Sequence, residues 1–182
     1  TEYSPVYPLY KGEKPRQTTE KTIKSAITKG YETVKHTHIS DYQTLYNRVK
    51  FTLSGDTASE KLPTDIRVKQ LQQGFTDDAS LKVLWFNLSR YLLISASRPG
   101  TLPSNLQGVW NTFEKAPWNG NFQSNINLQE MYWGCGPTQL PECEEAYLEW
   151  IEGLVEPGRK TAGEYYGTKG WVSHSTGNIW GH

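Results

Sequence analysis

The feature that most constrains the fold is one apolar segment near the middle of the chain. Its apolar residues follow spacings of three and four, the period of an α-helix, and further apolar side chains fall on other faces of the same helix. The first set is Leu81, Leu84, Trp85, Leu88, Tyr91 and Leu92, and the second set is Val83, Phe86 and Leu93. A helix that is apolar on nearly all sides must be covered by neighbours. We therefore expect a central helix of about twenty residues, capped by Asp77 or Asp78.

The same periodicity predicts further helices along the chain. They are expected over residues 19–34, 41–50, 65–73, 124–133 and 141–156, with another turn or two over 159–165. No segment alternates polar and apolar residues as a half-buried strand does. The fold class predicted from the sequence is therefore all-α.

The chain divides into three parts. Residues 1–16 contain three prolines and no period, which predicts an extended connector. Residues 17–55 are expected to form linker helices. Residues 56–182 hold the central helix and the segments after it, and are expected to form the first part of the main domain.

Composition excludes several classes of function. Lys and Arg total 19 and Asp and Glu total 19, so no net positive field attracts nucleic acid or anionic lipid. The central segment is interrupted by polar residues, so it does not predict a membrane span. Cys135 and Cys143 fit neither a redox pair nor a zinc ligand set, and we expect two buried free thiols. Neither a metal nor a cofactor is expected, and neither nucleic acid nor a membrane is expected as a partner.

Two segments combine aromatic residues, amides and glycine: 105–111 (NLQGVWN) and 118–133 (WNGNFQSNINLQEMYW). The first lies in residues 98–120, a stretch without periodicity that is long enough to suggest a functional loop. Aromatic faces flanked by amides suit the apolar C–H faces and hydroxyl edges of a sugar. Asn125 and Asn127 bracket the expected start of a helix, so capping and turn formation are one interpretation and a ligand site is the other.

These segments carry a resemblance to a known family. The runs LPTDIRV, RYLLISASRPGTLPSNLQGVWN, PWNGNFQSNINLQEMYW and GRKTAGEYYGTKGWVSH resemble family 95 of the glycoside hydrolases. That family contains 1,2-α-L-fucosidases and α-L-galactosidases. The resemblance implies that this chain is part of an (α/α)₆ toroid whose reaction inverts the anomeric carbon. It also implies an oligosaccharide substrate and a secreted or periplasmic location.

The resemblance assigns roles to the asparagine pair. In the family an Asn-x-Asn pair, backed by an Asp, holds the attacking water while a Glu protonates the leaving oxygen. The matching residues are Asn125 and Asn127. A carboxamide can orient a water but has no usable proton affinity near neutral pH, so a carboxylate must polarise that water. The Glu and the Asp are expected beyond His182. We therefore expect residues 1–182 to need the remainder of the parent enzyme as a partner and to hydrolyse nothing alone.

The resemblance also suggests substrate contacts, with departures that bear on substrate preference. Gln123 stands where many relatives carry His or Thr beside the C5 substituent of the sugar, and His174 lies in SHSTGNIW, where relatives tend to read HHNTDIW. His174 is interpreted either as a pocket residue or as a packing histidine. Relatives commonly read Met-Asn before Tyr-Trp where this chain has Glu130-Met131, and Glu130 is either structural or part of the site. The candidates for a sugar-facing wall, each of which a packing role also explains, are Trp110, Trp118 and Trp133.

Two rival functions remain open at this level. One is a non-catalytic carbohydrate-binding or scaffolding helical domain that keeps a pocket without chemistry. The other is a helical partner-binding module, which predicts an apolar groove without clustered amides. The density of Asn and Trp in residues 105–133 argues mildly against the second.

Overall fold

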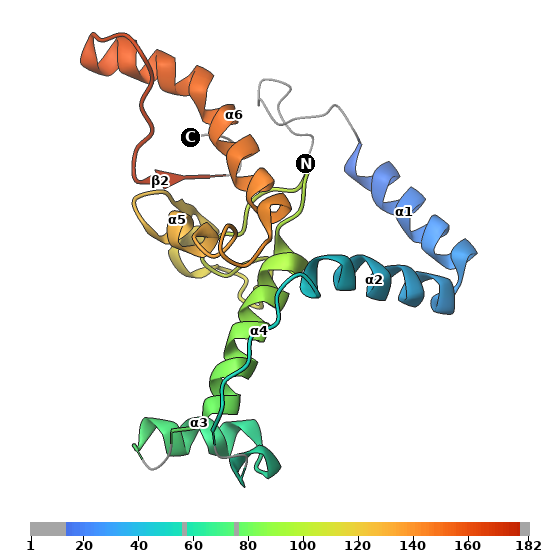
Figure 1. The fold of residues 1–182 in the computed structure, drawn as a ribbon. Helices are drawn as coiled ribbons and strands as arrows, with labels where there is room; N and C mark the ends of the chain where they lie inside the picture. The colour runs from blue at the N-terminus through green and yellow to red at the C-terminus, as the bar shows by residue number, and fades with distance from the viewer. Residues whose placement is uncertain (1–13, 56–57, 75–76, 179–182) are drawn as a thin grey trace.

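A computed structural model describes residues 14–55, 58–74 and 77–178 (Figure 1). Within these ranges the chain is mainly helical, and the all-α prediction is confirmed. The α-helices are α1 (Pro15–Lys29), α2 (Tyr31–Tyr46), α3 (Thr64–Gln72), α4 (Ala79–Ala96), α5 (Asn127–Tyr132) and α6 (Pro141–Tyr166). The 3₁₀ turns are Ala58–Lys61 and Pro117–Gly120, and the two short strands are β1 (Phe122–Gln123) and β2 (Thr176–Gly177).

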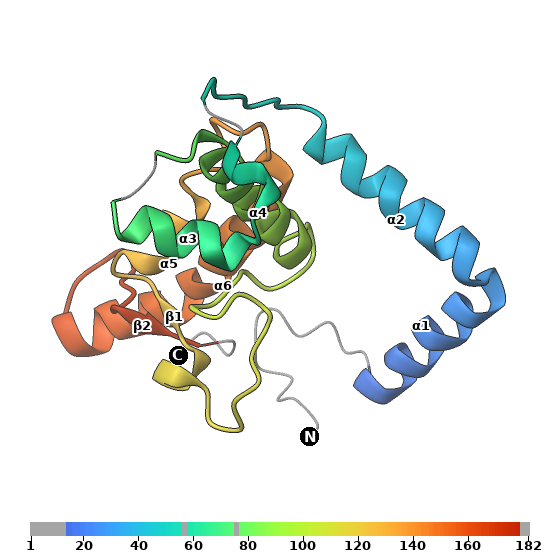
Figure 2. The same ribbon diagram turned by 90° about the horizontal axis from the view of Figure 1, so that it is seen from below.

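Helices α1 and α2 form an arm that stands away from the rest of the molecule (Figures 1 and 2). The expected helices over 19–34 and 41–50 were bounded wrongly, because the break falls at Gly30, which has a φ of 76°. A positive φ suits glycine and interrupts an α-helix. Most of the expected connector, residues 1–13, lies outside the described residues, and α1 already begins at Pro15, whose fixed φ suits a first helical position.

Helix α4 has the length and the N-terminal cap that the sequence predicts. The Asp78 carboxylate accepts a hydrogen bond from the Leu81 N–H at 2.9 Å, and it also pairs with the Arg67 guanidinium of α3. The expectation that α4 is covered on nearly all sides is wrong for the described residues. One of its faces is exposed, and the residues on this face are Leu84, Trp85, Leu88, Tyr91 and Leu92. Helices α2 and α3 contact α4 toward its two ends, and the extended segment 47–55 runs beside it, with Phe51 packed against Phe86 (Figure 1).

The hydrophobic core lies where the ends of α2 and α4 meet α5 and the first half of α6. Its buried members are Leu45, Ile94, Phe122, Leu128, Tyr132, Cys135, Leu140, Cys143, Trp150 and Leu154. Arg90 of α4 closes this junction, because its guanidinium donates to the Leu45 and Tyr46 carbonyls at the end of α2. Both cysteines are buried free thiols, as expected, and burial raises the pKa of Cys135 to about 12.

Helices α5 and α6 differ from the lengths expected. α5 has six residues and begins at Asn127 rather than Ser124. α6 continues through Pro157 to Tyr166, so the expected break at 157–158 is wrong. Proline removes one helical hydrogen bond, but Leu154, Gly158 and Ala162 follow one another at a spacing of four and are all buried. Their packing maintains the helix across that position.

Candidate functional site

The asparagine pair lies at the entrance to α5. Ile126, with a φ of −165° and a ψ of −40°, is the N-cap residue and has no side-chain cap hydrogen bond. Asn125 precedes it and Asn127 is the first helical residue. Both asparagine side chains are exposed, and neither makes a hydrogen bond with any other part of the chain that the structure describes. Neither asparagine therefore caps α5, and both carboxamides are accessible to a ligand or a water.

The turn that carries the pair is attached to a distant segment of the chain. β1 pairs antiparallel with β2, so that Phe122 lies opposite Gly177 and Gln123 lies opposite Thr176. Directly after β1, the Ser124 N–H donates to the Ser175 carbonyl at 2.9 Å, and the Ser124 hydroxyl donates to the His174 carbonyl at 2.8 Å. The structure therefore brings two of the predicted site segments, 123–127 and 173–176, into direct contact.

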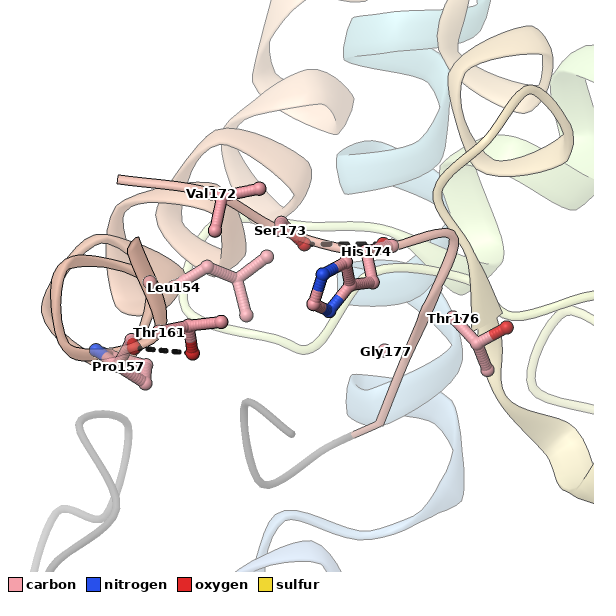
Figure 3. Close-up of a pocket in the computed structure, with 9 residues that line it drawn as sticks. Leu154, Pro157, Thr161, Val172, Ser173, His174, Thr176 and Gly177 are labelled. Atoms are coloured by element: carbon pink, nitrogen blue, oxygen red, sulfur yellow. Dashed lines mark hydrogen bonds between the residues drawn. The ribbon is translucent and has the colours of Figure 1, made fainter. Parts of the chain in front are cut away.

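His174 borders a small cavity beside α6. The cavity has a volume of about 130 Å³, and Leu154 and Thr161 contribute to its lining. Figure 3 shows the imidazole ring extending toward these two residues, while the side chain of Thr176 points away. The His174 Nε2 lies 2.9 Å from the Tyr166 hydroxyl. The ring thus has one protein partner, and the residue is otherwise largely exposed.

The loop between α4 and β1 brings the two amide-rich segments together. Asn105 forms a tight turn with Gly108, whose N–H donates to the Asn105 carbonyl at 2.8 Å. A Cβ atom at Gly120 would lie 3.5 Å from the Asn105 Nδ2, so the turn at 105–108 approaches the turn at 117–120. Gly108 itself must be small, because a Cβ there would lie 3.0 Å from the Trp110 ring.

The three candidate tryptophans do not line one common cavity. Trp110 is half-exposed and borders a cavity of about 320 Å³ that Leu92, Leu93 and Met131 also line. Trp133 borders a different cavity of about 390 Å³. Trp118 is 74% exposed and adopts a φ of 54°, a strained conformation for a residue with a bulky side chain. Within the described residues Trp110, Trp118 and Trp133 are 49%, 74% and 64% exposed, and both the sugar-wall and the packing interpretations stay open for them.

Carboxylates near the pair offer little local chemistry. Glu130 is exposed, and among the described residues it forms neither an ion pair nor a side-chain hydrogen bond. The described ranges contain no group of three or more His, Cys, Asp or Glu side chains placed to hold a metal ion. None of the helices described is both long and apolar enough to cross a membrane.

Sequence reasoning missed the residues that hold α5 in place. The Gln129 Nε2 donates to the Ser124 carbonyl at 2.5 Å. The buried Tyr132 hydroxyl accepts from the Ser104 N–H at 2.9 Å and lies 2.8 Å from the Ser97 hydroxyl. The capping-box pattern did not predict Gln129, because the N-cap is Ile126 rather than Ser or Thr and the Gln129 amide donates to the Ser124 carbonyl instead of accepting from the N-cap N–H. The partners of Tyr132 are distant in sequence, and no local sequence pattern predicts these contacts.

Comparison with known proteins identifies the family. Residues 30–182 match the model of the glycosyl hydrolase family 95 catalytic domain. The chain belongs to glycoside hydrolase family 95. The match includes α5, both asparagines and the segment that carries His174. The family resemblance expected from the sequence is therefore confirmed over most of the chain.

Individual members of the family are similar in sequence to this chain. It is 42% identical to alpha-L-fucosidase 2 of Arabidopsis thaliana over 160 residues, which are 87% of this chain and 19% of that protein. It is 37% identical to the probable alpha-fucosidase A of Aspergillus niger over 175 residues, 95% of this chain and 22% of that protein. The corresponding Aspergillus oryzae protein is also 37% identical, over 95% of this chain and 24% of its own length. The chain thus spans about a fifth to a quarter of these relatives.

Proposed function

We propose that this chain supplies the water-positioning part of an inverting glycoside hydrolase site that acts on α-L-fucosides or the closely similar α-L-galactosides. The observation that carries the proposal is the state of Asn125 and Asn127. Their carboxamides are exposed, have no hydrogen-bond partner among the residues that the structure describes, and lie on a turn that is attached at both sides. Family membership and the names of the fucosidase relatives support the substrate class.

We assign to the asparagine pair the role of orienting the attacking water. An amide oxygen accepts a hydrogen bond from the attacking water and fixes the direction of its lone pair toward the anomeric carbon. Activation of that water and protonation of the leaving oxygen require two carboxyl groups, one on each face of the sugar. Glu130 is the carboxylate nearest to the pair in sequence, and it lies one turn along the short helix. We assign both carboxyl roles to residues outside 1–182.

The substrate contacts are part of the same proposal. Gln123 and His174 come from the two paired segments next to the asparagines, which favours them as contacts to the sugar. Trp110 and Trp118 belong to the loop between α4 and β1, in which the turns at 105–108 and 117–120 approach each other. We assign both tryptophans to the sugar-facing wall. The exposure of both rings supports this role better than a packing role.

The exposed face of α4 fits a domain that other helices complete. Its members recur at the helical period and remain 41–67% exposed within the described chain, and they are Leu84, Trp85, Leu88, Tyr91 and Leu92. An apolar surface of this kind is normally buried. We propose that further helices of an (α/α)₆ toroid pack there, and that residues 1–182 alone do not hydrolyse the substrate.

The test is release of L-fucose from an α-1,2-fucosylated oligosaccharide by the protein as its gene encodes it, with the matching L-galactoside assayed in parallel. NMR during the first turnovers should detect the β-anomer, because inversion of an α-linked sugar gives that product. Asn125→Ala and Asn127→Ala should each lower kcat about 100-fold, whereas Asn47→Ala, on the exposed end of α2, should not. Retention of configuration, or full activity in both variants, would contradict the proposal.

The second candidate is carbohydrate binding without hydrolysis. It is favoured by the same exposed amides and tryptophans, because those groups suffice to hold a sugar. Calorimetric titration with the same oligosaccharide separates the two functions. Binding without any release of L-fucose from the full gene product would establish this alternative.

A further inference from the structure

We infer that Gln129 is a positioning residue for the asparagine pair and that it acts through the backbone of Ser124. The inference rests on the proposed function of Asn125 and Asn127. It assigns to Gln129 no contact with the substrate, only control over the turn that presents the two amides.

The geometry encloses the pair in a closed loop. Gln129 is the third residue of α5, in its first turn, and its Nε2 donates a hydrogen bond back to the Ser124 carbonyl at 2.5 Å. A carbonyl oxygen only accepts hydrogen bonds, so the amide nitrogen must be the atom that faces it. The ring formed by residues 124–129 and this bond contains Asn125, Ile126 and Asn127.

The other side of Ser124 is held by a different part of the chain. Its N–H and its hydroxyl donate to the carbonyls of Ser175 and His174, at 2.9 and 2.8 Å. The N–H, the hydroxyl and the carbonyl of Ser124 are therefore all hydrogen-bonded, and the three partners are Ser175, His174 and Gln129. Residues 174 and 175 hold Ser124 through their backbone carbonyls. These two bonds therefore do not depend on the side chains at positions 174 and 175.

The turn gains from such support because the start of α5 has no cap of its own, although its buried side holds the helix through Leu128 and Tyr132. α5 has six residues, fewer than an isolated helix requires for stability in water. Its N-cap residue is Ile126, which has no side chain able to cap the helix. Without the Gln129 bond, residue 126 would keep its helical bond from the Glu130 N–H, at 2.9 Å, but no side-chain bond would join α5 to Ser124 across the asparagine pair. A displacement of the amides by about 1 Å is enough to reduce catalysis strongly.

The decisive variant is Gln129→Met, which keeps an unbranched side chain of similar length and removes both amide atoms. Two effects on Tm oppose each other in this variant: it loses the Nε2 bond to the Ser124 carbonyl, and it removes a buried Oε1 that has no hydrogen-bond partner among the described residues. A role limited to packing predicts normal activity in this variant. A positioning role predicts that kcat falls at least about 10-fold while KM stays within about threefold, a loss of activity that any change in Tm does not account for. Gln72→Met, on exposed α3, is the matched control.

Backbone hydrogen exchange provides a second readout that does not depend on activity. Exchange of the peptide covering residues 124–128 should be faster in Gln129→Met than in the unmodified protein, and unchanged in Gln72→Met. Ser124→Ala, which loses the bond to the His174 carbonyl, should also make exchange of this peptide faster. It replaces Gln129→Met as the test if that variant fails to fold. Ser89→Ala removes a similar hydroxyl-to-carbonyl bond within α4 and is its control.

The outcomes separate the two proposals. If the unmodified protein releases neither fucose nor galactose, the proposed function fails, and the exchange data still decide whether Gln129 holds the turn. Exchange and kcat that both remain at the unmodified values in Gln129→Met would overturn the positioning role. Loss of kcat in proportion to a lowered Tm, without a local change in exchange, would also overturn it.

Discussion

The apolar faces of α4 and α6 have the same helical period but differ in what covers them. On α6, Cys143, Ala146 and Trp150 are buried among α5, β1 and the end of α4. On α4, Trp85 is 67% exposed and Leu88 is 48% exposed. The period of apolar residues therefore establishes that a helix has an apolar face. Whether that face is covered depends on elements elsewhere, and in this chain only the α6 face has them.

The largest expected effect comes from making the same change on both faces. Trp150 is 1% exposed and its ring packs edge-on against Phe122, with centroids 5.0 Å apart. Trp150→Ala should lower the free energy of unfolding by about 3–5 kcal/mol, because it leaves a large cavity. In residues 1–182 alone, Trp85→Ala should change it by no more than about 0.5 kcal/mol. Urea denaturation measures both, and equal effects would show that the α4 face is covered in solution.

A smaller effect is expected at the hydroxyl network that ties α5 to the end of α4. The Ser97 hydroxyl donates its one hydrogen to the Cys143 carbonyl at 2.7 Å, so the Tyr132 O–H must donate to Ser97 and accept from the Ser104 N–H. Tyr132→Phe leaves that buried N–H without a partner. It should destabilise the fold by about 1–2 kcal/mol.

Tyr165→Phe is the control for this network, since Tyr165 is 79% exposed. Its unfolding curve should superimpose on that of the unmodified protein. Equal stability of both variants would show that the Tyr132 hydroxyl does not hold α5 against α4.

Local signals predicted the parts of the fold that local chemistry determines. The Asp78 cap, the start of α4 and the long irregular segment after residue 97 all follow from residues adjacent in sequence. Pro157 misled the prediction because its local cost is outweighed by packing on the buried side of α6. The length of α5 was overestimated, since Asn125 reads as a helix start although Ile126 is the residue that occupies the N-cap.

The candidate site shows the same division. The residue types at positions 123–127 were recognisable from sequence, as was the family to which they belong. The pairing of Gln123 with Thr176 was not, because two-residue strands have no periodicity to detect. Contacts between residues about fifty positions apart depend on the tertiary fold. The sequence therefore identified the amides but not the groups that hold them.

The smallest effect concerns acid stability at the covered end of α4. The Arg48 guanidinium donates two hydrogen bonds to Glu142 at the start of α6, at 2.8 and 2.7 Å, and lowers the pKa of this carboxyl from 4.5 to about 2. A depressed carboxyl pKa stabilises the fold above the unfolded-state value, and this contribution is lost as the pH falls through the folded-state value. Because the pair is about one-third exposed, the contribution at pH 7 should not exceed about 1 kcal/mol.

Glu142→Gln should therefore be less stable than the unmodified protein at pH 7, and the difference should shrink as the pH falls from about 4.5 to about 2. The contribution of Asp78 to the stability of the fold also falls over this pH range in both proteins, because Arg67 holds the pKa of Asp78 well below its ordinary value. The difference between the two unfolding curves isolates Glu142. Glu149→Gln, on the exposed side of α6, should show no such dependence. A difference that stays constant with pH would assign the effect of Glu142 to packing at the α2–α6 contact rather than to its charge.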